Sequence, residues 1–121
     1  MTTIHANTPR DVLSRLEVLV LQAGVDLPQR AIQQQIVSAV HLIVHTNHFE
    51  DGSRKIAAIA EVRRGAGESI DVENIFEFVP TGADLKGHIQ GRLRATGHYP
   101  RSLVEKLERS GFQLPPTIFQ K

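Results

Sequence analysis

Residues 2–17 read TTIHANTPRDVLSRLE, and within this stretch the sequence changes from an extended pattern to a helical one. Residues 2–6 are rich in β-prone side chains and predict the end of a short strand. In the helix that follows, Thr8 can cap the first turn, Pro9 suits the first helical position, and Asp11 completes a capping box. The stretch therefore predicts a strand that leads directly into a helix.

His5 and Asn7 lie between this strand and this helix, next to the backbone N–H groups of the first helical turn. Such N–H groups bind anions, so the position suits the sensing of a phosphate. The residues alone also allow a second interpretation, in which Asn7 is an ordinary capping residue and His5 is a partly buried histidine with a structural partner. From physical chemistry alone, this second interpretation is the more common one.

The rest of the chain predicts a second helix, several strands and a last helix. The first helix runs to about Ala23 and stops at Gly24, and Asp26 caps a second helix that begins near Pro28. From His41 onward, helical spacing gives way to β-prone runs separated by turn residues. The expected elements are a strand core at 42–44, a turn at 50–53, a return strand at 54–63, a turn at 65–68, a strand at 70–78 that Pro80, Thr81 and Gly82 end, a strand and loop at 87–99, a helix at 100–110, and an extended tail at 114–119 packed by Ile118 and Phe119.

Length and composition indicate one globular domain. The chain has 121 residues, of which 40% are hydrophobic and 22% are charged, a balance typical of globular proteins. It contains no cysteine, which excludes disulfides and thiolate metal sites and suits a reducing compartment. No apolar run approaches the roughly 18 residues of a spanning helix, and the N-terminus lacks the core of a signal peptide. We therefore expect a cytoplasmic protein that is not transmembrane.

Charge is distributed unevenly along the chain. Residues 41–85 contain four basic and eight acidic side chains, whereas residues 86–121 contain seven basic and two acidic ones. A basic tail can meet nucleic acid, a membrane surface or an acidic partner, but it is more often only a solvated surface. Arg92 and Arg94 share a strand face in this tail. Because no aromatic residues lie between them, we do not expect nucleic-acid binding.

Two further clusters of titratable residues have ordinary explanations. Three histidines follow one another on the first strand, but His41 and His45 share a face and His48 points the other way, so a metal site is not favoured. An acidic stripe on one face of a later strand is more typical of a solvated surface than of paired acid–base catalysis. Its members are Asp71, Glu73 and Glu77.

Several motifs are absent from the sequence. There is no G-x-x-x-x-G-K-[ST] loop to surround a triphosphate, and no apolar strand ends in an acidic pair that binds Mg²⁺. The nucleophile motif G-x-S-x-G and the zinc motif H-E-x-x-H are also missing. Taken alone, the chain lacks the parts of a complete active site.

Residues 3–17 resemble the His box of the secretion-superfamily ATPases, which drive type II and type IV secretion, conjugation and pilus assembly. The likeness is closest to the CpaF type, which serves tight-adherence pili. It covers nearly the whole chain in order, at the spacings of the family. A departure is the stretch 61–67, which is more basic than the family pattern. The other matching stretches are 27–32, 35–40, 51–56, 74–76, 95–100, Leu103, Gly111, 114–116 and Phe119.

This resemblance implies an α/β fold, the C-terminal portion of a RecA-like P-loop NTPase domain with a small mixed α+β C-terminal subdomain. The strands that carry the P-loop and the acidic motif would be absent from this chain. The implied parts are the His box at 3–17, core helices at 9–40, a hairpin at 41–63 and the C-terminal subdomain at 69–121. The first helix is apolar on several sides, so we expect part of its surface to remain uncovered.

The same resemblance implies a function as part of a hexameric ATPase that powers secretion or pilus assembly. In the intact domain His5 would sense the terminal phosphate, Asn7 and Arg15 would hold the segment near the nucleotide, and ATP and Mg²⁺ would bind. The chain alone would hold no cofactor and hydrolyse no ATP. Its partners would be identical or P-loop-bearing subunits in a ring and platform proteins of the inner membrane, at the cytoplasmic face. The alternative is a small stand-alone adaptor that binds a partner through its basic C-terminal part.

Overall fold

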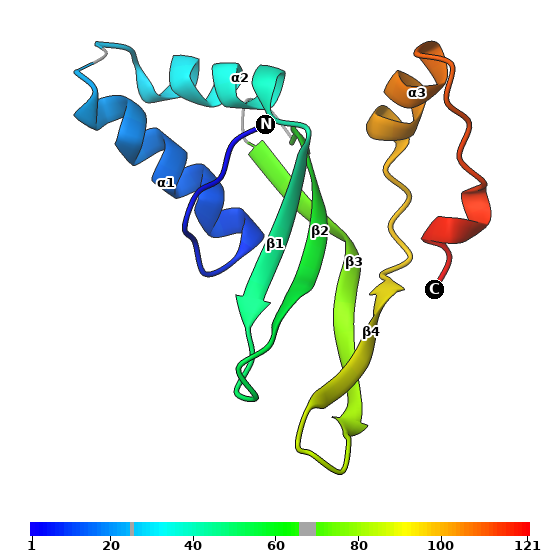
Figure 1. Cartoon of the computed structure of the whole chain (residues 1–121). Coiled ribbons are helices and arrows are strands. Elements are labelled where there is room, and N and C mark those ends of the chain that lie inside the picture. The colour runs from blue at the N-terminus through cyan, green and yellow to red at the C-terminus, as the bar shows by residue number, and fades with distance from the viewer. Residues whose placement is uncertain (25, 66–69) are drawn as a thin grey trace.

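Four antiparallel strands form one sheet, and helices pack on both of its faces (Figure 1). The computed structural model of the chain describes residues 1–24, 26–65 and 70–121. Each strand pairs with the next one along the chain, so the sheet has the order β1-β2-β3-β4. The strands are β1 (Leu42–His48), β2 (Arg54–Arg64), β3 (Ile70–Ala83) and β4 (Ile89–Ala95).

The chain is therefore a small domain of mixed helix and strand, in which β1 and β2 pair as an antiparallel hairpin. The predicted turn at 65–68 lies largely outside the described residues. The RecA-like origin of the fold stays a prediction.

The first helix, α1 (Pro9–Gln22), begins and ends as the sequence predicts. The Thr8 hydroxyl accepts a hydrogen bond of 3.1 Å from the Asp11 N–H. The Asp11 carboxylate accepts in return from the N–H of Asn7, at 3.2 Å, one residue before the cap. After the helix, Gly24 adopts a left-handed φ of 76°, which closes the last turn.

Residues 2–6 do not form the predicted strand, and the chain is irregular there. Ile4 and Ala6 instead pack against the apolar core beneath them. His45 of β1 meets this segment through its side chain, with its Nε2 atom 3.4 Å from the Ala6 carbonyl oxygen. β-prone residues form a strand only where a neighbouring backbone offers ladder hydrogen bonds, which explains why the prediction was wrong.

The second helix, α2 (Gln29–Ala39), begins without the predicted Asp26 cap. Pro28 occupies the N-cap position, and its carbonyl accepts a hydrogen bond of 3.2 Å from the Ile32 N–H. A capping side chain serves the N–H groups two or three residues after it, when it stands at the N-cap itself. Asp26 stands two residues before that position, so the capping prediction was wrong.

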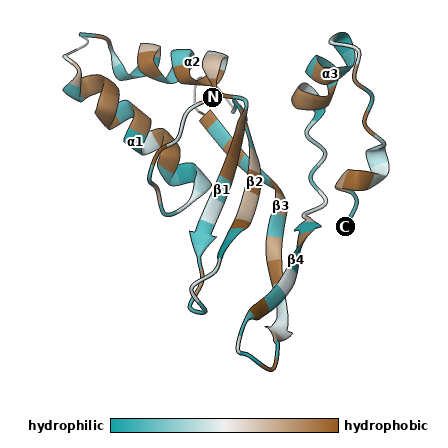
Figure 2. Cartoon of the chain, in the orientation of Figure 1, coloured by the Kyte–Doolittle hydropathy of each residue, from teal (hydrophilic) through white to brown (hydrophobic). Residues whose placement is uncertain are grey.

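The main apolar core lies between the sheet and the helices α1 and α2, and we call this side of the sheet the α1/α2 face. Figure 2 shows the apolar stretches of these helices and strands in brown. Burial of large side chains here supplies the dominant stabilisation, at roughly 1.5–3 kcal/mol for each Leu, Ile or Val. The buried members are Val12, Leu13, Ile32, Ile36, Ile43, Ala60, Val62 and Val72.

The outer side of α1 is apolar but uncovered, as the sequence predicts. Val18, Leu19 and Leu21 are 50%, 51% and 58% exposed. A helix on the surface of a domain normally presents charged or polar residues on its outer face. This side of α1 therefore has the composition of a buried surface.

Strand β3 continues through the residues that were expected to end it. Pro80 pairs with Gly91 of β4, and the register shifts between Pro80 and Gly82. Proline cannot donate a ladder hydrogen bond, so it is tolerated in a strand mainly at such irregular positions. The predicted break was wrong because the bulge accommodates Pro80 within the strand.

The C-terminal unit consists of α3 (Arg101–Arg109) and the 3₁₀ turn η1 (Pro116–Phe119). Val104 and Phe119 pack on Ile75 of β3 in a second, smaller apolar cluster. We call the side of the sheet covered by this unit the α3 face. The packing role of Phe119 in the tail is confirmed, whereas Ile118 is 41% exposed.

Candidate functional site

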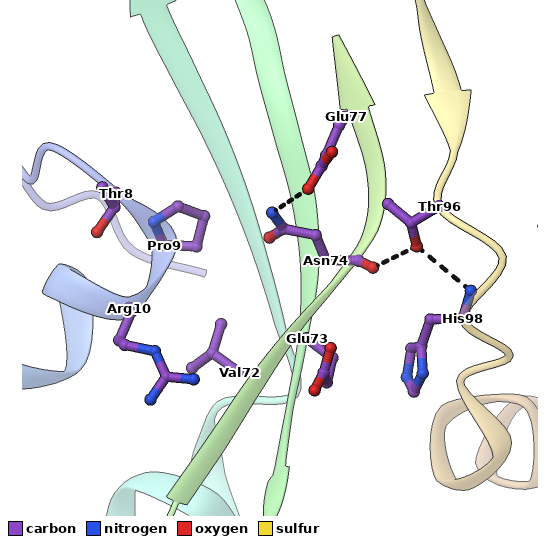
Figure 3. A pocket seen from close by; sticks show the side chains of 9 residues that line it. All are labelled: Thr8, Pro9, Arg10, Val72, Glu73, Asn74, Glu77, Thr96 and His98. Atoms are coloured by element: carbon purple, nitrogen blue, oxygen red, sulfur yellow. Dashed lines mark hydrogen bonds between the residues drawn. The ribbon is translucent and has the colours of Figure 1, made fainter.

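An open pocket of about 410 Å³ lies between the start of α1 and the outer edge of β3 (Figure 3). Its residues come from three parts of the chain that are far apart in sequence. They are Thr8, Pro9 and Arg10 of the α1 start, Val72, Glu73, Asn74 and Glu77 of β3, and Thr96 and His98 of the segment between β4 and α3.

The edge of β3 is open at this pocket because β4 pairs with β3 only from Phe76 onward. The last contact is made by Thr96, whose hydroxyl donates to the Asn74 carbonyl oxygen at 2.6 Å. On the β1 side of β2, the Val62 N–H donates to the carbonyl of His41, the residue just before β1, at 3.0 Å, so Val62 directs its backbone groups away from β3. Its partner Val72 therefore directs its own N–H and C=O toward the pocket, by the alternation of antiparallel ladders.

A bulge divides the acidic residues of β3 between the two faces of the sheet. Ile75 has no partner in β2, so the side-chain alternation shifts by one residue at this point. Asn74 and Glu77 lie on one face and are joined by a hydrogen bond of 2.8 Å from the Asn74 amide. The interpretation of a single acidic stripe was therefore wrong for Asp71, Glu73 and Glu77.

A buried carboxylate that contacts a histidine lies behind the pocket, on the α3 face. Glu61 of β2 is only 2% exposed, and its Oε1 atom lies 3.0 Å from Nε2 of His98. The other carboxylate oxygen has no hydrogen-bond partner among the described residues. The His98 N–H in turn donates to the Thr96 hydroxyl at 3.3 Å, which ties the segment before α3 to the sheet.

The sequence contains a signal that Glu61 is a buried and paired residue, which the sequence analysis missed. Glu61 stands in an apolar run of β2, and glutamate is almost never fully buried unless it is paired. Thr96 and His98 lay within a stretch that matched the resembled family, without a predicted role. No local pattern connects His98 with Glu61, because the two are 37 residues apart.

The three residues predicted to act on a nucleotide do not line the pocket, although Asn7 directly precedes its lining residue Thr8. The N–H of Asn7 and the Nε atom of Arg15 both approach the Asp11 carboxylate, at 3.2 and 3.9 Å. The Arg15 side chain is 56% exposed, so this ion pair contributes little stability. The His5 side chain is exposed. Their functional roles stay predictions.

The three histidines of the first strand region have different neighbours. His41 Nε2 lies 2.9 Å from Nζ of Lys106 in α3, whereas His45 contacts the carbonyl of Ala6. His48 is exposed at the far end of β1. Across residues 1–24, 26–65 and 70–121, no group of three or more His, Asp or Glu residues has the arrangement of a metal site.

Two aspartates fix the loops at the opposite end of the sheet. Asp51 accepts hydrogen bonds from the Ser53 hydroxyl, from the Ser53 N–H and from the Ile89 N–H of β4, at 2.7 Å for the last. The Ser53 hydroxyl has the largest effect in holding the pKa of Asp51 well below its usual range. The His88 N–H similarly lowers the pKa of Asp84.

In the part of the chain that the structure describes, no helix combines the length and the apolar character needed to span a membrane.

Comparison with known proteins finds two relatives that are both named for conjugal transfer. No family model matches the sequence. Two proteins of Mycobacterium tuberculosis, from strains CDC 1551 / Oshkosh and ATCC 25618 / H37Rv, bear names that assign them to conjugal transfer. Each is 35% identical to this chain over 65 residues, which cover 54% of the chain and 18% of the relative. The chain therefore matches less than a fifth of the length of these relatives.

Proposed function

We propose that the chain acts in conjugation or secretion as the C-terminal part of a ring-forming ATPase that powers secretion or pilus assembly. Two observations on the sequence support the proposal. The sequence resembles the secretion-superfamily ATPases in order along nearly its whole length, and the similar proteins are named for conjugal transfer. In this proposal the missing P-loop and Mg²⁺ ligands are supplied by the remainder of the domain or by another subunit.

The observation that carries the proposal is the form of the His-box segment. Its helix start is capped through Thr8, while the side chains of His5 and Asn7 remain exposed. The N-terminus of α1 carries the positive end of the helix dipole, which favours a phosphate nearby. In the intact domain, His5 would contact the terminal phosphate of ATP, and Asn7 and Arg15 would hold the segment in place.

The uncovered side of α1 supports the partner assignment. Val18, Leu19 and Leu21 form an apolar surface of the kind that another part of a larger domain covers. Identical or P-loop-bearing subunits and inner-membrane platform proteins are the proposed partners. The proposed location is the cytoplasm, at the inner face of the membrane.

The test is the His5→Ala substitution in the longer protein or assembly that contains this segment. We expect ATP turnover to fall by about tenfold or more with little change in nucleotide affinity, because a phosphate sensor acts mainly as charge moves in the transition state. His48→Ala is the matched control, since His48 is also an exposed histidine. Equal turnover in wild type and His5→Ala would remove the His-box assignment.

The stand-alone adaptor has one observation in its favour. The described residues already bury an apolar cluster on each face of the sheet, as a self-sufficient domain does. A monomer that melts cooperatively well above about 60 °C and binds no hydrophobic dye would favour this second function. A marginally stable chain that binds such a dye through the outer side of α1 would favour the ATPase.

A further inference from the structure

Strand β3 has a free edge over residues 70–74, because β4 does not follow it there. β4 pairs with β3 only from Phe76 onward, and the chain then leaves the sheet at Thr96, whose hydroxyl donates to the Asn74 carbonyl at 2.6 Å. The backbone N–H and C=O of Val72 point toward the pocket, where no strand of the described residues pairs with them. An unpaired strand edge of this kind is a template for another extended chain.

The free edge lies inside a slot that can take such a chain. The start of α1 bounds the pocket on one side, through Thr8, Pro9 and Arg10, and Thr96 and His98 bound it on another (Figure 3). The volume of about 410 Å³ is within the range of ligand-binding clefts. Extended peptides bind at exposed sheet edges by adding a strand, and main-chain hydrogen bonds then supply the affinity.

The side chains beside the free edge are acidic on the α3 face. Asp71 and Glu73 flank Val72, whose own side chain is buried in the main core, so they point to the opposite face of the sheet. Glu61 is the cross-strand partner of Glu73. The base among them is Arg63, which lies 3.8 Å from Glu73 in a partly exposed and therefore weak ion pair. Three carboxylates around one guanidinium leave an excess of negative charge, which favours a basic partner.

Strand β4 shows which side chains β3 accepts from a neighbouring strand. Where the two strands pair, Arg94 stands directly opposite Glu77, and the next residue of β4 on that face, Arg92, is also a base. Opposite charges across a ladder stabilise the pairing, whereas like charges destabilise it. A strand that lay along the free edge would meet Asp71 and Glu73 in the same way, so bases at alternate positions suit it best.

We propose that the free edge of β3 binds an extended segment of a partner protein, which adds as a strand beside residues 70–74 and carries lysine or arginine at alternate positions. Its backbone bonds to the N–H and C=O of Val72. Its basic side chains lie against Asp71 and Glu73 on the α3 face, and the uncharged residues between them face the start of α1, where Arg10 stands. The proposal does not depend on any ATPase role.

The experiment titrates the purified chain with a short peptide of alternating threonine and lysine. This peptide should bind at least about tenfold more tightly than a peptide of the same length with glutamate in place of lysine. Hydrogen exchange of the Val72 N–H should slow when the lysine peptide is bound. Glu73→Lys should weaken its binding about tenfold or more, because like charges then face each other across the ladder. Glu108→Lys is the matched control, since it reverses an exposed glutamate on α3.

Several results would overturn the proposal. One is a lysine peptide that does not bind to the wild-type chain, or that binds equally well to Glu73→Lys. Another is binding that leaves the exchange of the Val72 N–H unchanged, or that persists when the peptide nitrogens are methylated, because the peptide would then be held by charge alone and not by strand pairing. Circular dichroism establishes that each variant is folded, and Asp71→Lys is a second variant with the same expected loss of binding.

Discussion

Two histidines of this molecule, His98 and His5, differ in whether their side chains have a buried partner. His98 lies against a carboxylate that is 2% exposed and links the segment before α3 to the sheet. His5 lies on an irregular segment with its side chain in solvent. A polar side chain with a buried partner holds structure together, whereas an exposed one beside a helix N-terminus is available to a ligand. The difference gives His98 a structural role, whereas the exposure of His5 indicates no such role.

The largest expected effect on stability comes from the buried partner. Glu61→Ala should lower the free energy of unfolding by roughly 3 kcal/mol, because breaking a buried polar pair leaves uncompensated groups behind. Glu61→Gln, which keeps the shape and one hydrogen bond, should cost less. Urea denaturation measures both, and hydrogen exchange should show the largest loss of protection in α3. Two variants as stable as wild type would show that the buried pair does not hold the C-terminal unit.

An intermediate effect is expected from the hairpin support at Asp51. Since its pKa is lowered in the folded state, its contribution to stability is present above the ordinary pKa of about 3.8 and is lost as the pH falls below that value. Wild type should therefore lose stability on acidification, and Asp51→Asn should lose less over the same range. Thermal melts carried from pH 7 down to about pH 2, through the range below 3.8 where the contribution is lost, measure the difference. Identical pH profiles would contradict the role of Asp51.

The smallest effect is expected at His5. His5→Ala should change the free energy of unfolding by no more than about 0.5 kcal/mol, as is usual for exposed positions without special contacts. The same denaturation experiment measures it beside Glu61→Ala. A loss comparable to that of Glu61→Ala would make His5 a structural residue and would end the contrast between the two histidines.

The parts of the fold that sequence could predict are those set by local chemistry. The Thr8 cap, the stop at Gly24 and the turn at 50–53 each depend on residues within a few positions of one another. The strand expected at 2–6 failed because a strand needs a distant partner. Pro80 predicts a break from its own sequence, whereas the bulge that accommodates it depends on pairing with the distant strand β4.

Only the part of the candidate site that depends on local sequence could be predicted, because the rest depends on contacts between residues far apart in the chain. The start of α1 follows from its own sequence, and it forms one wall of the pocket. The other walls depend on where β4 leaves β3 and on the link from His98 to Glu61, which is 37 residues away. Neither the open edge of β3 nor the pairing of Glu61 with His98 is encoded in a local pattern.

The most direct test of the proposed function compares ATP hydrolysis by the purified chain alone with hydrolysis by the chain together with the subunit or domain that carries the P-loop. The chain alone should show no turnover, because positioning of the γ-phosphate needs the absent loop and Mg²⁺ ligands. Turnover should exceed that of the P-loop part alone when this chain is added, and His5→Ala should remove the increase. Hydrolysis that follows the concentration of the isolated chain, or no increase on combination, would contradict the proposal.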